Sequence, residues 1–352
     1  MNARNIVPLV VACAFLAPAP RGETAPATSI QDDLPLELGE PRDITTDFQV
    51  VTPSGSAVGP DGSLYIADRG RTLITKLDQK GNIVWQKGRS GQGPGEYGML
   101  HRISVSPDGE IAVLDHRPQQ VTWLDRDGVF IRRASLPLRI RALDSIVALE
   151  GRRVAISGVA SGAPLHAIRV FELVDDDNVL HEVHAFGPLP VAKNAQALNY
   201  WGVGTLRMAG DGTLLFSRKL PYEIYRFDPG GELQEMFEGT YEFTAGPDDN
   251  VVETRTGDRV RLSISATPVP SPCPAHDLGN GWVLSGVMVD REGHGQWDLF
   301  HNGTYVGSLE PPHGRAYVSS VDRERGYIYV ANTSPDDEAA YLQIPYKIDH
   351  NP

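Results

Sequence analysis

One pattern occurs twice in the sequence, and this repetition limits the possible folds more than any other feature. Residues 61–68 read Asp-Gly-Ser-Leu-Tyr-Ile-Ala-Asp, and residues 108–115 read Asp-Gly-Glu-Ile-Ala-Val-Leu-Asp, 47 positions further on. The Asp-x-x-Gly turn of residues 78–81 recurs with the same spacing at residues 125–128. A fixed period in this range indicates a repeat architecture, in which each unit packs against its neighbours.

Apolar side chains alternate between these landmarks. Leu64 and Ile66 fall on one side of the segment, and Tyr65 and Ala67 fall on the other. Such a run predicts a short β-strand, and the bounding Asp-Gly supplies the positive φ angle that a tight hairpin needs. Each unit holds four strands of this kind. The pattern is typical of one blade of a β-propeller, whose two faces are covered only by the neighbouring blades.

Four weaker copies of the unit follow, at residues 146–171, 206–231, 281–303 and 326–347. We therefore predict an all-β fold, a six-bladed β-propeller of four-stranded antiparallel blades. An N-terminal strand within Ile44 to Val51 is expected to join the last blade and close the ring, which removes exposed strand edges.

Two connections, residues 187–202 and 239–274, are too long for plain loops, and long insertions in repeat proteins usually gather on one face. Val260 to Ile264 alternates apolar and polar residues, which predicts a strand. A seventh blade at this place therefore remains an alternative.

Residues 91–97 and 103–109 carry a resemblance to a known family. They read Gly-Gln-Gly-Pro-Gly-Glu-Tyr and Ile-Ser-Val-Ser-Pro-Asp-Gly. This resembles the NHL-repeat propellers, whose units join Gly-x-Gly-Pro-Gly-x-aromatic to an inner strand, a turn and a strand ending in Ala-Asp. The resemblance covers residues 55–133. It implies a six-bladed β-propeller of the NHL-repeat type, a fold also similar to TolB-like and gluconolactonase-like six-bladed propellers.

The first 27 residues have the pattern of a secretory signal peptide. Arg4 is the one charge among the first twenty residues, and the apolar run that follows is too short to span a bilayer. We expect residues 1–27 to be a signal peptide, residues 28–42 an acidic, proline-containing tail, and residues 43–350 a single propeller domain. The protein is therefore expected to be secreted or periplasmic, without a membrane span. The residues before Cys13 loosely resemble a bacterial lipobox, so a lipid anchor there stays open.

The charge of the chain limits the class of partner, and its cysteine content limits what can stabilise the fold. The 352-residue chain carries a net charge of −13, which argues against a nucleic-acid partner. Without the leader, Cys273 is the one remaining cysteine, so no intramolecular disulfide is expected and the fold must depend on its core.

Loops that lead into the inner strands of a propeller share one face, here called the upper face, and ligands commonly bind there at the channel mouth. Aligning the units on Asp-Gly places Arg, His and aromatic residues in these loops. A guanidinium group can grip a carboxylate or phosphate; alternatively, these are solvated side chains with local salt bridges. The candidate ligand-binding residues are His101, Arg102, Arg141, Tyr200, Trp201, His313, Arg315 and Tyr317. The same alignment places on this face Arg69, His116, Arg117 and Arg139.

Catalytic motifs are scarce. His181-Glu-Val-His184 lacks the spacing of a zinc-protease helix and falls in a predicted outer strand, and no Gly-x-Ser-x-Gly elbow occurs. Asp68 and Asp115 end repeated strands at equivalent positions, which favours a role in stabilising turns over catalysis. No catalytic residue, metal ligand or cofactor is therefore predicted.

Two functions remain open. The first is an exported, non-catalytic binding module that presents its upper face to a protein, glycan or small anionic ligand. The alternative is a hydrolase or lyase of the gluconolactonase-like type, with a divalent metal in the central channel. The predicted inner strands offer little for a hard cation, which needs several oxygen ligands, because only His276 and Asp277 of blade five lie near the axis.

Overall fold

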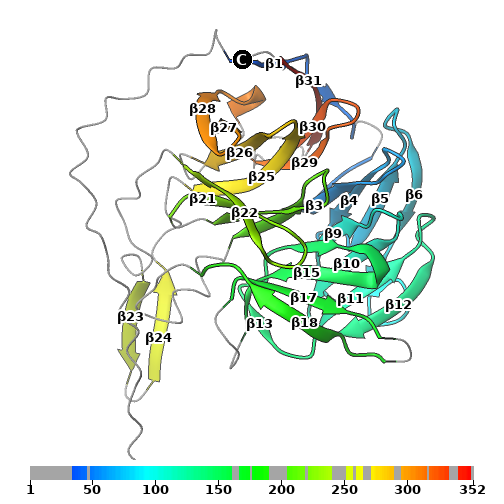
Figure 1. The fold of residues 1–352 in the computed structure, drawn as a ribbon. Helices are drawn as coiled ribbons and strands as arrows, with labels where there is room; N and C mark the ends of the chain where they lie inside the picture. Colours follow the sequence, from blue (N-terminus) through cyan, green and yellow to red (C-terminus); the bar gives the residue numbers. More distant parts are fainter. Residues whose placement is uncertain are drawn as a thin grey trace, which may run out of the picture.

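The structure, a computed structural model, consists of six β-blades arranged in a ring, without α-helices in the described part of the chain (Figure 1). The described residues are 34–45, 48–160, 166–174, 177–189, 204–218, 221–239, 251–256, 259–264, 271–288, 295–314, 317–332 and 340–349. In Figure 1 the colours pass around the ring from blue to red, which brings the first and last blades together.

Each blade is a four-stranded antiparallel sheet whose first strand lies nearest the axis. Blade one consists of β3 (Pro53–Val58), β4 (Leu64–Asp68), β5 (Leu73–Leu77) and β6 (Ile83–Lys87). Blade two consists of β9 (Leu100–Val105), β10 (Ile111–His116), β11 (Gln119–Leu124) and β12 (Phe130–Ser135). Blade three consists of β14 (Ile146–Ala148), β15 (Arg153–Ser157), β17 (Ile168–Glu172) and β18 (His181–Phe186).

The second half of the ring repeats this order. Blade four consists of β19 (Thr205–Met208), β20 (Leu214–Arg218), β21 (Glu223–Phe227) and β22 (Leu233–Glu238). Blade five consists of β25 (Ser271–Gly279), β26 (Trp282–Met288), β27 (Gly295–His301) and β28 (Thr304–Leu309). Blade six begins with β29 (Val318–Asp322), β30 (Tyr327–Asn332) and β31 (Ala340–Ile348).

Short elements lie between the blades or between strands of one blade. The pair β7 (Arg89–Ser90) and β8 (Glu96–Tyr97) precedes blade two, and β13 (Ile140–Arg141) pairs with β16 (Val159–Ala160) beside blade three. Two short 3-10 turns also occur, η1 (Glu150–Arg152) and η2 (Pro312–Gly314).

The ring is closed at the N-terminus, but not by the predicted segment. The strands β1 (Leu36–Leu38) and β2 (Arg42–Asp43) pair with β31, so the expectation of a closing strand within Ile44 to Val51 is wrong. Ile44 and Val50 are instead buried as side chains in the contact between blades six and one. β1 and the first residue of β2 therefore come from the segment interpreted as a tail, residues 28–42, of which residues 34–42 are described.

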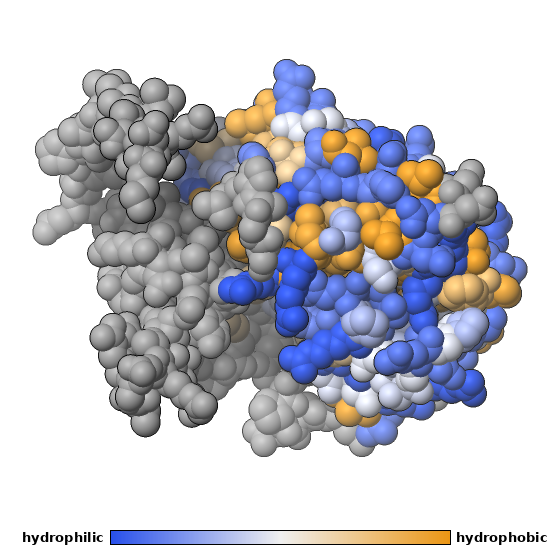
Figure 2. Space-filling view, turned by 90° about the horizontal axis from the view of Figure 1, so that it is seen from below, coloured by the Kyte–Doolittle hydropathy of each residue, from blue (hydrophilic) through white to orange (hydrophobic). Residues whose placement is uncertain are grey.

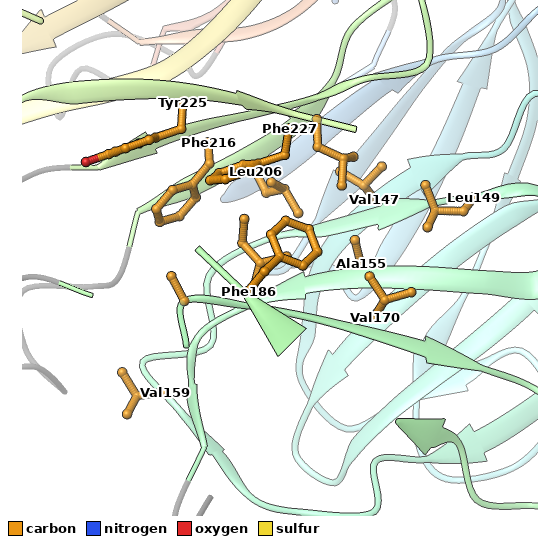
Figure 3. Close-up of a cluster of buried hydrophobic side chains, with 13 residues drawn as sticks. Val147, Leu149, Ala155, Val159, Val170, Phe186, Leu206, Phe216, Tyr225 and Phe227 are labelled. Carbon is orange, nitrogen blue, oxygen red and sulfur yellow. The ribbon is translucent and has the colours of Figure 1, made fainter. Parts of the chain in front are cut away.

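Six hydrophobic clusters hold the blades together, one at each contact between neighbouring blades. Leu64 and Ile66 pack toward blade six, whereas Tyr65 and Ala67 pack toward blade two, as the alternation predicts. Figure 3 shows the cluster between blades three and four, where the rings of Phe186 and Phe227 meet edge to face with centroids 5.1 Å apart. Because every blade is covered on both faces, the core runs around the whole ring.

The long connection before blade five forms a hairpin rather than a seventh blade. The strand at residues 260–264 is confirmed as β24 (Arg259–Ile264), which pairs with β23 (Val251–Thr256) in a sheet of two strands. Figure 1 draws this hairpin apart from the ring.

The Asp-Gly landmarks form the predicted hairpin turns between first and second strands. Gly62 has a φ of 72° and its N–H donates to the carbonyl of Gly59 at 2.8 Å. Gly109 has a φ of 89° and its N–H donates to the carbonyl of Ser106 at 2.9 Å. Only glycine adopts this left-handed conformation without strain, which explains why the residue recurs in both copies.

Asp68 and Asp115 stabilise turns, as their repetition predicts. The Asp68 carboxylate accepts hydrogen bonds from the N–H groups of Val51 and Thr52, both at 2.9 Å. The Asp115 carboxylate accepts from Gly98 at 2.6 Å and Met99 at 2.7 Å, the positions that are equivalent in the next repeat. Each carboxylate thus ties the end of a second strand to the segment that leads into the inner strand of its own blade.

We expect Asp115→Ala to lower the free energy of unfolding by about 2–4 kcal/mol, because it removes a buried carboxylate that accepts hydrogen bonds from several backbone N–H groups. Asp115 is completely buried and accepts a third bond from Arg117 N–H at 3.0 Å. Urea titration measures the loss. The exposed Asp127→Ala is the matched control, with an expected change within about 0.5 kcal/mol. Equal changes in the two variants would contradict this role for Asp115.

Candidate functional site

Polar side chains from all six blades gather around the upper part of the axis. The inner strands follow one another around the ring and contact their neighbours in turn, so their polar residues come together although they are distant in sequence. The cluster, called the axial cluster below, contains Ser56, Arg102, Asp144, Arg207, His276 and Tyr317, one residue from each blade or the loop that leads into it.

Arg102 is fixed in this cluster by its own contacts. Its Nη1 donates to the backbone carbonyl of Ser54 in blade one, and its Nη2 lies 3.3 Å from Asp144 Oδ1 in front of blade three. The side chain keeps 19% of its surface exposed, so a solute can still reach it. Burial alone lowers the pKa of Arg102, but the phenol of Tyr317 and the carboxylate of Asp144 outweigh it, and the net pKa is raised.

Arg207 lies nearby, and fewer hydrogen bonds and opposite charges offset its positive charge. Its Nη1 donates to the carbonyl of Leu206 at 2.9 Å, and its Nε is buried without a hydrogen-bond partner in the described structure. Burial lowers the pKa of Arg207, and the positive charge of Arg102 lowers it further, although Tyr317 and Asp144 act in the opposite direction. Among the described residues no carboxylate forms an ion pair with Arg207. The axial cluster therefore holds two guanidinium groups and one described carboxylate.

Two histidines near these arginines are held neutral. His276 is 4% exposed and its Nε2 lies 3.1 Å from the carbonyl of Val318; burial and the charge of Arg207 lower its pKa to about 3. His101 Nε2 lies 3.0 Å from the carbonyl of Leu143, and burial together with Arg102 lowers its pKa to about 4. Because a carbonyl oxygen only accepts, each Nε2 carries the proton and each Nδ1 is an acceptor.

This neutrality predicts a loss of stability in acid. Since the pKa of His276 falls from 6.5 in the unfolded chain to about 3 in the folded protein, the unfolded state binds more protons below pH 6.5. The stabilisation is complete above that pH and is lost as the pH falls toward 3. At pH 4.5 we expect His276 to cost on the order of 2–3 kcal/mol, and His276→Gln to lose correspondingly less between pH 7 and 4.5.

Denaturant titrations at the two pH values test this. The exposed His181, whose ring bonds to Asp177 at 2.7 Å, supplies the control variant His181→Gln, which should keep the wild-type acid loss. A His276→Gln protein that loses as much stability as the wild type would refute the assignment of this acid loss to His276.

The predicted ligand-binding residues are only partly brought together. His101, Arg102 and Tyr317 lie at or next to the axial cluster. Arg141 is exposed in β13, where it pairs with Val159 of β16. His313 lies in η2. Three further candidates lie outside the described residues, namely Tyr200, Trp201 and Arg315.

Sequence reasoning missed Arg207 and Asp144. Arg207 lies inside an inner strand, and its one signal in the sequence is a single cation between Leu206 and Met208. His276 lies at the axis as expected, but Asp277 points elsewhere: its Oδ2 accepts from Gly210 N–H and from Arg323 Nη1, both at 3.0 Å.

The described residues contain no group of three His, Cys, Asp or Glu side chains placed to hold a metal ion. His181 and His184 lie in the outer strand β18, as expected. Cys273 forms no disulfide in the described part of the chain. No helix in the described part of the chain is long and apolar enough to cross a membrane.

The surface of the described residues mixes hydrophilic and apolar side chains. Figure 2 shows hydrophilic residues interrupted by apolar groups on the face viewed from below Figure 1. Exposed large apolar side chains include Val129, Val174 and Val183, which belong to blades two and three and are separated in sequence. Isolated exposed apolar residues of this kind are normal on soluble proteins and do not mark a ligand site.

Comparison with known proteins agrees with the repeat pattern. NHL repeat-containing protein 3 from Mus musculus is 28% identical over 114 residues, and its Homo sapiens counterpart is 29% identical over 112 residues. The matches cover 31% and 30% of this chain, and about one third of the length of each relative. The chain is a six-bladed β-propeller with repeats similar to those of NHL proteins. No family model matches it.

Solved structures share the propeller's architecture. An exported-protein candidate from Bacteroides fragilis superposes with a TM-score of 0.60 at 13% identity, covering 92% of this chain and 98% of the other. A streptogramin B lyase superposes with a TM-score of 0.51 at 14% identity, covering 88% and 98%. A gluconolactonase from Xanthomonas campestris gives 0.50 at 14% identity, covering 85% and 87%. Identities this low show a common fold and leave function to the site itself.

Proposed function

We propose that the protein is an exported binding propeller that holds a small anionic ligand at the axial cluster. The observation that carries this proposal is the pair Arg102 and Arg207, two half-buried guanidinium groups near one described carboxylate, Asp144, which is bonded to Arg102. Holding like charges together inside a protein costs free energy, which an anion recovers through charge-assisted hydrogen bonds. Export is supported by the leader-like composition of residues 1–27.

The arrangement favours binding of an anion over metal-assisted hydrolysis. Asp144, the described carboxylate of the axial cluster, is already bonded to Arg102, and the two guanidinium groups repel a divalent cation. A hard cation prefers several carboxylate or carbonyl oxygens. The lyase and gluconolactonase neighbours therefore support this chain's fold but supply no argument for their activities.

The test is a thermal-shift panel on the purified protein. We expect phosphate, citrate, succinate or a related anion to raise the melting temperature in a saturable way, because a ligand that binds only the folded state stabilises it. Glucose and Mg²⁺ serve as neutral and cationic comparisons. Metal analysis and a lactonase screen distinguish the alternative enzyme. Stabilisation by Mg²⁺ together with lactone hydrolysis, and no response to anions, would overturn the proposal.

A further inference from the structure

A second group of cations lies on the upper face, around His116 at the end of β10. Arg69 follows β4, Arg117 follows β10 and Arg139 precedes β13, and all three side chains are exposed. The Gln119 side chain bonds to both the N–H and the carbonyl of Ile140, at 2.9 and 2.5 Å, which holds Arg139 beside Arg117. We call these four residues the rim cluster.

The charges of all three arginines act on the ring of His116. Burial lowers the pKa of His116, the charges of Arg117 and Arg139 lower it further, and Arg69 adds a smaller lowering, while Asp115 acts in the opposite direction. Asp115 is occupied by backbone N–H groups, and none of the ion pairs in the described structure involves the three arginines. In a chain of net charge −13, the rim cluster is therefore a local concentration of positive charge.

The rim cluster adjoins the axial cluster. The ring of His116 meets the ring of His101 edge to face, with centroids 5.3 Å apart, and His101 is followed directly by Arg102. On the other side, Arg69 N–H donates to the carbonyl of Thr52 at 2.9 Å, two residues before Ser54, whose carbonyl accepts from Arg102. Two histidines thus separate a pair of inner guanidinium groups from three outer ones.

The two histidines between the clusters also limit which chemical groups the ligand can carry there. The Nδ1 atoms of His101 and His116 are both buried without a partner in the described residues. For His101, the bond from Nε2 to Leu143 leaves Nδ1 as an unprotonated acceptor. A hydroxyl or amide group of a ligand between the two clusters would satisfy such an acceptor, whereas a second anion there would not.

We propose that the ligand is an elongated molecule with two separate carboxylates, one bound at the axial cluster and the other at the rim cluster. The inference rests on the proposed axial function and names its ligand class. Guanidinium forks match carboxylates with paired hydrogen bonds. When one end of such a ligand binds, the other is held at high effective concentration near the second cluster, so two weak contacts combine into a stronger one.

Calorimetric titration of a homologous series tests the proposal. The probes are propionate and the linear dicarboxylates from succinate to azelate, with wild-type protein, Arg117→Ala/Arg139→Ala and Arg207→Ala. For the wild type we expect affinity to rise by about tenfold or more over propionate at the chain length that bridges both clusters. The double variant should lose this rise while still binding propionate like the wild type. A series in which no dicarboxylate exceeds propionate, or a rise that survives in the double variant, overturns the inference.

The axial variant separates the two proposals. Arg207→Ala should weaken every probe, propionate included. If Arg207→Ala weakens binding but the double variant changes nothing, the axial function stands and the rim inference falls. If Arg207→Ala changes nothing, the axial function falls, and the rim inference falls with it. Arg126→Ala removes the same charge from an exposed turn between β11 and β12 and should leave the whole series unchanged.

Discussion

Val113→Asp is expected to abolish folding. Val113 lies in β10 with no exposed surface and packs in the cluster between blades one and two. The new carboxylate would be buried among apolar side chains without a partner, at a cost of several kcal/mol. This loss is comparable with the whole stability of a domain, about 5–15 kcal/mol. Far-ultraviolet circular dichroism and the yield of soluble protein measure the effect.

The matched control is Val129→Asp on the same blade. Val129 is 54% exposed next to the turn at Gly128, so the same substitution there should change stability by less than about 0.5 kcal/mol. A soluble Val113→Asp protein that melts cooperatively near the wild-type temperature would show that the assigned strand register is incorrect.

Arg207→Ala is expected to weaken binding of the best anion by about 1.5–3 kcal/mol, or roughly 10- to 150-fold in Kd, the scale of hydrogen bonds to a charged group. Stability should not fall with it. Burial and Arg102 already lower the pKa of Arg207, which means that the folded protein holds this charge at a cost.

Titration calorimetry and thermal melting of the same samples separate the two effects. A variant that binds like the wild type would remove Arg207 from the site. A variant that melts far below the wild type would show instead that this side chain supports the fold.

The fold could be predicted because its determinants are local and repeated. Asp-Gly turns and alternation at Leu64 to Ala67 fix strands and faces within a few residues of each other, and the structure confirms both. The closing strand was misplaced for a physical reason. β1 is only three residues long, too short to show a period, and it pairs with a strand at the far end of the chain, where Leu36 lies opposite Ile348.

The site was harder to predict because it depends on which side chains the ring brings together. Aligning the units on Asp-Gly found Arg102 and Tyr317. Tyr317 directly precedes β29 as expected, whereas Arg102 lies in the first half of β9 and not in the loop before it. Arg207 stands within a strand, and nothing in Leu206 or Met208 distinguishes an axis-facing cation from one on a blade face. Asp144 belongs to the site only because it contacts Arg102, which lies 42 positions away in the sequence.

The most direct test of the axial site is a crystal structure of the protein soaked in sodium selenate, with selenium located by its anomalous scattering. Selenate is an anion with the hydrogen-bonding geometry that guanidinium groups recognise. We predict a selenium peak on the propeller axis, with selenate oxygens within hydrogen-bonding distance of both Arg102 and Arg207. Peaks confined to the outer surface, with the two guanidinium groups left without an anion, would contradict the account.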